Sequence, residues 1–194
     1  MQKEVYLIRG TPTETYDGFR KKIIALSEDV LENDRPEQLK ICLTEKHPPP
    51  ISVIPFRRSK MASISVFRKK GTPLKAFTDA KGFTGAYAVE EALPVRYSRD
   101  WDDREYTPGA CLLTLFHKKP GLDRDTFIRR WHQGHTPLSL KLHPLWNYIR
   151  NVVKGTLTDN SSWYDGIVEE QVQKASDLLN PFVFFGPVWN CLLY

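Results

Sequence analysis

The spacing of apolar residues in the first third of the chain predicts a strand followed by a helix. An apolar and β-branched run at 4–10 ends in a glycine, as strands commonly do. The segment 11–34 then carries apolar residues at steps of three and four, which predicts a helix with one buried face. These apolar positions are Tyr16, Phe19, Ile23, Leu26 and Val30.

The next segments return to alternating or short apolar runs and predict three more strands. These runs lie at 39–44, 62–69 and 91–98. Pro73 can open a second helix between the last two, which carries Leu74 and Phe77 and could extend to Tyr87. Pro94 has no backbone N–H, so the last of these strands is predicted at a sheet edge. The resulting order is β-α-β-β-α-β, which is the ferredoxin-like arrangement.

The second half of the chain repeats this plan. Strands are predicted at 110–118, 146–157 and 165–172, and a helix capped by Asp123 follows the first of them. The pattern after the third strand is helical again. By analogy with the first half, a final strand would begin near residue 192, so the second half is predicted to lack a complete last strand before Tyr194.

The charged segment 98–109 contains a Pro-Gly turn and is typical of a connector. It divides the chain into a diverged first repeat at 1–105 and a second repeat at 106–194. A sheet with helices on one face needs a cover for its other face. The prediction is therefore an α+β fold of two tandem ferredoxin-like repeats that pack as an internal dimeric α/β barrel. An exposed edge strand could also pair two chains as a homodimer.

Composition narrows the class of partner. The chain has 194 residues, a formal net charge of +5 and 41% hydrophobic residues, and its basic residues are scattered rather than gathered in a stripe. We therefore expect no nucleic-acid partner. No apolar run reaches the roughly 18 residues of a membrane span, and three distant cysteines form no CxxC pair. We expect a cytoplasmic protein that meets no membrane and binds a small molecule.

The stretch FIRRWHQGHTPL (127–138) raises the question of histidine chemistry. His135 comes four residues after Trp131 and eight after Phe127, so on a regular helix it faces the sheet. There it could act as a general base, or it could simply bond a neighbouring strand. His132 falls on the flank of the apolar face. The glutamate of an HExxH motif is missing, so we expect no metal site.

The proposed repeat also predicts which residue of the first half corresponds to His135. If Phe19 is aligned with Phe127, then Ser27 falls on His135. One half of the protein would then carry a histidine where the other carries a serine.

Two further positions could contribute to a site. The hydroxyl of Tyr148, with Trp146 just ahead of it, could orient a carbonyl or phenolate, although a buried tyrosine with one hydrogen bond is the simpler interpretation. Asp165 precedes Gly166 at a strand start, where it could cap a turn or orient a histidine.

Three stretches of the second half together resemble the EthD family of dimeric α/β barrels. They are LFHKKPGLDRDTFIRRWHQGHTPL, HPLWNYIRNVV and WYDGIVEEQV, within residues 110–180. The family histidine corresponds to His135, the strand tyrosine to Tyr148 and the third-strand acid to Asp165. The resemblance implies a barrel fold, whose members include cofactor-free monooxygenases, cyclases, decarboxylases and haem-degrading enzymes.

The resemblance suggests a cofactor-independent enzyme of the lyase, cyclase or monooxygenase type. Its substrate would be a small aromatic or polyketide-like metabolite. His135 would be the general acid or base and Tyr148 would orient the substrate, with Asp165 as the third catalytic candidate. The substrate would lie against Phe127, Trp131 and Trp146. Two alternatives remain open, namely a non-enzymatic ligand-binding or stress-associated barrel, and a haem-binding barrel with His135 as axial ligand.

Overall fold

The computed structural model describes residues 1–46 and 59–186. Its contacts divide the chain into two compact units. Unit 1 contains the described residues 1–46, 59–91 and 151–164, and unit 2 contains 92–150 and 165–186. The segment 151–164 therefore belongs to unit 1, although it lies within the second half of the sequence.

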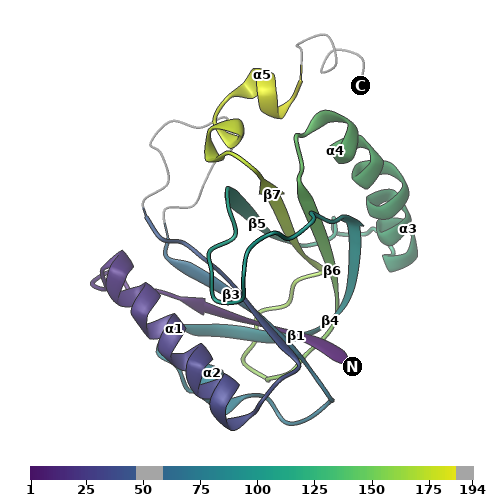
Figure 1. Ribbon diagram of the computed structural model, residues 1–194. Coiled ribbons are helices and arrows are strands. Elements are labelled where there is room, and N and C mark those ends of the chain that lie inside the picture. Colours follow the sequence, from purple (N-terminus) through teal and green to yellow (C-terminus); the bar gives the residue numbers. More distant parts are fainter. Residues whose placement is uncertain (47–58, 187–194) are drawn as a thin grey trace. The chain divides into compact units, whose positions relative to one another are not determined.

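Unit 1 contains an antiparallel sheet with two helices (Figure 1). Its elements are β1 (Gln2–Arg9), α1 (Tyr16–Asn33), β2 (Gln38–Leu43), β3 (Met61–Arg68), α2 (Lys75–Thr78) and β4 (Phe83–Val95). β1 pairs with both β3 and β4, and β2 pairs with the other edge of β3. The predicted element order of the first half is present, since strands and helices follow one another as β-α-β-β-α-β.

The core of unit 1 lies between the sheet and α1. Alternate residues of β1, such as Tyr6 and Ile8, point to the helical side and are fully buried there. They pack with Phe19, Ile23 and Val30 of α1, which are also fully buried. The apolar stripe that predicted this helix is therefore the stripe that the sheet covers.

Three local predictions for unit 1 are wrong. The second helix ends at Thr78, and Tyr87 lies on the strand β4 instead. α1 begins at Tyr16 rather than near residue 11, because the Thr15 side chain caps it by accepting from the Gly18 N–H at 3.0 Å. β4 is not an edge strand, since it lies between β1 and β6 (Asn147–Thr156) in the sheet. Pro94 is tolerated because it lies close to the C-terminal end of β4, beyond the residues that pair with β1.

Unit 2 combines strands with an interrupted helix. Its elements are β5 (Ala110–Phe116), α3 (Arg124–Arg129), the π-helical turn η1 (Arg130–His135), α4 (Thr136–Leu142), the first part of β6, β7 (Gly166–Val172), the 3-10 turn η2 (Ala175–Leu178) and α5 (Pro181–Phe184). β5 pairs antiparallel with β7 along its whole length. The helices predicted after 172 are the short η2 and α5.

The strands follow the hydrogen-bonded order β2-β3-β1-β4-β6-β7-β5, and the fold is a mixed α+β fold. The tandem ferredoxin-like repeat and the internal barrel stay predictions. The strand predicted near residue 192 lies outside the described residues. Within 1–46 and 59–186, none of the helices combines the length and apolar character needed to cross a bilayer.

Candidate functional site

The helical segment of unit 2 contains one irregular turn. Asp123 caps its start, with the side chain accepting from the Thr126 N–H at 2.8 Å. The helix then widens at η1, where the Thr136 N–H bonds the carbonyl of Trp131, five residues earlier instead of four. Such a π turn accommodates one extra residue, and π turns are frequent at functional sites.

The extra residue changes which side chains face the sheet. The buried positions are Phe127, Trp131, Thr136 and Ser139, and His135 is exposed. The prediction that His135 faces the sheet is therefore wrong. It assumed a regular helix, in which the residue four after Trp131 lies on the same face, whereas the π turn brings the residue five after it to that face.

The hydrogen bonds of buried hydroxyl groups in α1 and in the helix of unit 2 differ by the same one residue. In α1 the Ser27 Oγ donates to the Ile23 carbonyl, four residues earlier, at 2.8 Å. In unit 2 the Thr136 Oγ1 donates to the Trp131 carbonyl, five residues earlier, at 3.0 Å. Both hydroxyls are buried. Ser27 and Thr136 thus share burial and a hydrogen bond to a carbonyl one turn earlier, whereas His135, which was predicted to align with Ser27, is exposed.

His135 lies at the edge of this buried face. Its Nε2 is 3.4 Å from the Oγ of Ser139, which is fully buried on α4. Partial burial lowers the pKa of His135 below its usual value, and the nearby His143 lowers it further. His143 is held in place because its Nδ1 donates to the Phe184 carbonyl at 2.6 Å. The imidazole of His135 is thus favoured in its neutral form, which can accept a proton.

Tyr148 lies on the side of β6 that the helix covers. Its side chain is completely buried, and among the described residues its hydroxyl has no hydrogen-bond partner. Burial raises the pKa of Tyr148, while the nearby polar groups of Thr136 and Trp131 lower it in part. These groups are close to the hydroxyl without meeting hydrogen-bond geometry. The phenol is therefore neutral at physiological pH and has a proton available to donate.

Arg150 follows Tyr148 by two residues and so faces the same side of β6. Its Nη1 donates to the Thr136 Oγ1 at 2.9 Å, while its Nε is buried and has no partner in the described part of the chain. Burial lowers the pKa of the guanidinium, but arginine stays charged in proteins. Two donors, one neutral and one cationic, thus lie unsatisfied beside Thr136.

A carboxyl group completes the polar cluster. Glu170 of β7 is half-buried, and burial raises its pKa. Its charge acts on Tyr148, whose pKa it raises further. We call Thr136, Tyr148, Arg150 and Glu170 the polar cluster of unit 2.

Aromatic rings cover one side of this region. Phe116 of β5 lies 4.8 Å from the Trp131 ring and 6.0 Å from the Phe127 ring, measured between centroids. Gly166 leaves room for them, because a Cβ there would come within 2.5 Å of Phe116 and 2.7 Å of Trp131. The structure therefore brings the two predicted substrate-binding residues Phe127 and Trp131 together on the helical side of β7.

The other two predicted residues lie in different surroundings. Asp165 is buried, accepts from the Lys118 N–H at 2.9 Å and pairs with Arg124 at 3.7 Å, so it ties the turns that flank β5 and β7. Trp146 packs its ring against Tyr97 at 4.9 Å and Trp101 at 5.6 Å. The sequence left open whether Asp165 caps a turn or orients a histidine. Its contacts are those of a residue that holds turns.

Sequence reasoning missed three members of the polar cluster. Arg150 could have been found, because two-residue alternation from Tyr148 places it on the same strand face. Thr136 could not, because its inward position depends on the π turn. Glu170 could not either, because the sequence does not show which face of β7 the helix covers.

Residues 119–182 match the family model of the EthD domain. This EthD-like segment includes η1 and the polar cluster, and its match confirms the resemblance over these residues. None of the curated proteins matches the chain. Residues 1–46 and 59–186 contain no group of three or more His, Cys, Asp or Glu side chains that could hold a metal ion.

Proposed function

We propose that the EthD-like segment binds a small aromatic or polyketide-like carbonyl compound and catalyses proton transfer on it without a cofactor. The observation that carries this proposal is the buried hydroxyl of Tyr148 beside the Nε of Arg150, neither of which has a hydrogen-bond partner among the described residues. Buried donors without partners are costly, and those that persist in a fold often have a functional role.

The two donors suit an oxygen that gains negative charge during a reaction. An enolate or phenolate oxygen near Tyr148 would accept a hydrogen bond from the neutral phenol and would be attracted by the guanidinium of Arg150. Phe127 and Trp131 would contact the apolar body of such a compound. Thr136 positions the guanidinium, because its hydroxyl accepts from Nη1.

The proton acceptor in this scheme is His135. Its lowered pKa keeps the imidazole neutral at pH 7, and its exposed position at η1 lets the proton pass to water. The imidazole would remove a proton from the carbon next to the carbonyl, and the electron pair would move to the carbonyl oxygen. Asp165 would support the site by holding the flanking turns rather than by touching the substrate.

The test uses 2-tetralone, an aromatic ketone with acidic C–H bonds, as the probe. The wild-type chain should bind it and accelerate exchange of its α-protons with D₂O, followed by NMR. His135→Gln should reduce the exchange rate at least about tenfold while the probe still binds. Tyr148→Phe should weaken binding about fivefold, because a neutral hydrogen bond is lost.

The controls separate loss of chemistry from loss of fold. Tyr148→Phe removes an unpartnered hydroxyl, so its thermal stability should equal or exceed that of wild type. His117→Gln changes a histidine that lies outside the polar cluster, and it should leave exchange unaltered. An exchange rate in wild type no greater than in buffer would contradict the enzymatic proposal.

A second candidate function is binding without catalysis. It is favoured by the 3.4 Å approach of the His135 Nε2 to Ser139, which gives the imidazole a structural neighbour. In that case Tyr148→Phe would weaken binding of 2-tetralone, whereas His135→Gln would leave both binding and proton exchange unchanged. A Soret band on haem titration that is lost in His135→Gln would instead indicate the haem-binding alternative.

A further inference from the structure

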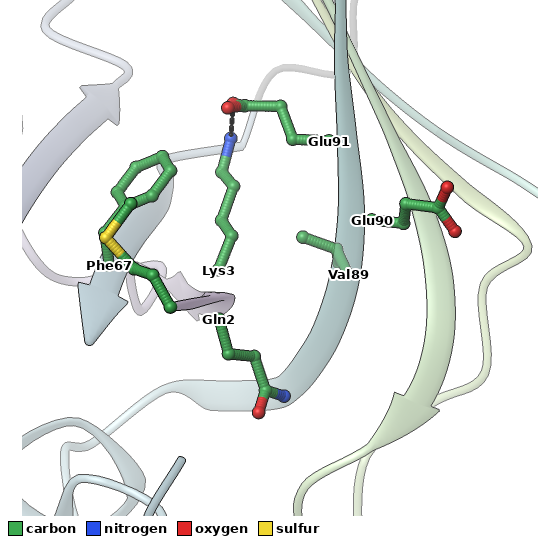
Figure 2. A pocket seen from close by; sticks show the side chains of 7 residues that line it. Gln2, Lys3, Phe67, Val89, Glu90 and Glu91 are labelled. Atoms are coloured by element: carbon green, nitrogen blue, oxygen red, sulfur yellow. Dashed lines mark hydrogen bonds and ion pairs between the residues drawn. The ribbon is translucent and has the colours of Figure 1, made fainter. Parts of the chain in front are cut away.

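Unit 1 has a pocket of about 350 Å³ that is open to solvent and lies outside the EthD-like segment, and we call it the cavity below. Figure 2 shows it beside the first residues of β1. Its lining residues come from β1, β3, β4 and the chain start, and they are Met1, Gln2, Lys3, Phe67, Val89, Glu90 and Glu91. The volume suits a ligand of modest size.

Lys3 lies at the centre of this cavity wall. It pairs with Phe67 of β3 on one side and with Val89 of β4 on the other, so the three residues form a row across the sheet. The Lys3 ammonium lies 5.3 Å from the Phe67 ring centroid, a cation–π distance. Its side chain is only 3% exposed. A cation is thus held on an apolar wall, where charge is costly without a counter-ion.

A counter-ion of this ammonium is Glu91, which is the more exposed partner of the pair. Its Oε1 lies 2.6 Å from the Lys3 Nζ, and its side chain is 21% exposed. In Figure 2 the Glu91 and Val89 side chains approach Lys3, whereas Glu90 points away from it. Glu90 pairs instead with Lys154 at 2.5 Å. The side chain of Glu91 thus has access to solvent, whereas the Lys3 ammonium is buried.

We propose that this cavity binds a small monocarboxylate with an apolar or aromatic body. The ligand carboxylate takes the place of Glu91 as the counter-ion of Lys3, and the apolar body packs on Phe67 and Val89. An amine is the weaker alternative, because it would have to displace the buried Lys3 from Glu91. The site does not depend on the function proposed for the EthD-like segment.

Benzoate and benzylamine are the probes, with binding to the full chain measured by calorimetry or by NMR shifts. Benzoate should bind more tightly than benzylamine. Glu91→Gln should raise the benzoate affinity about fivefold, because it removes a carboxylate that competes for the Lys3 ammonium. Lys3→Met should abolish benzoate binding.

Lys22→Met is the matched control, because Lys22 also pairs with a glutamate, Glu14 at 2.9 Å, and neither residue lines the cavity. It should leave the benzoate affinity unchanged. If Lys3→Met does not fold, Phe67→Leu keeps the ammonium and should weaken benzoate while leaving acetate binding unaltered. The proposal is overturned if benzylamine binds at least as tightly as benzoate, or if benzoate binds Lys3→Met or Phe67→Leu like wild type.

Discussion

At the residue scale, the candidate site is defined by buried polar groups that have no hydrogen-bond partner among the described residues. Tyr148 is fully buried with a phenol proton that no described residue accepts, and the Nε of Arg150 is in the same situation. Elsewhere a buried tyrosine is satisfied, as in unit 1, where the Tyr6 hydroxyl donates to Glu4 at 2.6 Å. The contrast singles out β6 as the place where a ligand oxygen would be accommodated.

The titration of His135 is a prediction at this scale. Its pKa should lie below 6.5, because partial burial and then His143 disfavour the imidazolium. Histidine ¹H–¹⁵N NMR over pH 4–8 measures this directly. In His143→Gln the pKa of His135 should rise but stay below 6.5, since burial is the larger cause.

The consequence for stability follows from the sign of the shift. The folded-state pKa of His135 is below its unfolded value, so its contribution to stability is present above pH 6.5 and is lost as the pH falls through the folded-state pKa. In His135→Gln this part of the acid dependence should disappear. An unchanged acid dependence of unfolding would mean that His135 is solvated as in the unfolded chain.

At the element scale, the π turn η1 decides which residues form the site. The apolar steps of α1 are regular, with Phe19, Ile23 and Ser27 four apart, and the helix of unit 2 shares the first step from Phe127 to Trp131. The next buried residue, Thr136, comes five later. One residue of extra length thus moves His135 to the exposed edge and brings a threonine into contact with Arg150.

Deleting His135 tests this account of η1. The deletion makes the Trp131-to-threonine spacing four, so a regular helix would keep the same buried face. The free energy of unfolding should stay within about 1 kcal/mol of wild type in urea denaturation. Deleting Arg129 instead should cost more than about 3 kcal/mol, because it shifts Trp131 and all later residues off the buried face. Equal losses in the two variants would show that η1 is not an inserted residue.

At the scale of the whole molecule, the two compact units are not continuous in the sequence. Unit 1 needs residues 151–164 from the second half of the sequence. Leu157 packs against its core, the Ala86 N–H donates to the Ser161 Oγ at 2.9 Å, and the Tyr87 hydroxyl donates to the Ser162 carbonyl at 2.7 Å. The division at residue 105 predicted from composition stays a prediction, and this interleaving gives a way to test it.

Separate expression of residues 1–105 and 106–194 should give chains that do not unfold cooperatively. The first fragment lacks the segment 151–164 that covers part of its core, and the second carries that segment without its partner. Circular dichroism during heating measures the cooperativity, and the intact chain is the control. Cooperative melting of fragment 1–105 at the temperature of the intact chain would support two autonomous halves instead.

Much of the fold was predictable from local pattern alone. The strands near 4–10, 62–69 and 165–172 and the helix around Phe19 were found because side-chain period reports exposure directly. Helix starts were less certain, since α1 begins at Tyr16, capped by Thr15, and not near residue 11. Buried positions in the candidate site were also predictable, because Tyr148, Phe127 and Trp131 lie on the covered faces of a strand and a helix.

The amino-acid sequence by itself determined the α+β element order of the first half, the EthD-like segment and the buried positions of Phe127, Trp131 and Tyr148. Only the tertiary structure decided the direction of His135, the inward position of Thr136 and the pairing of Lys3 with Glu91. An analysis of apolar periodicity assumes that helices are regular and that interacting residues are close in the sequence. A π turn breaks the first assumption, and cross-strand partners 88 residues apart lie beyond the second.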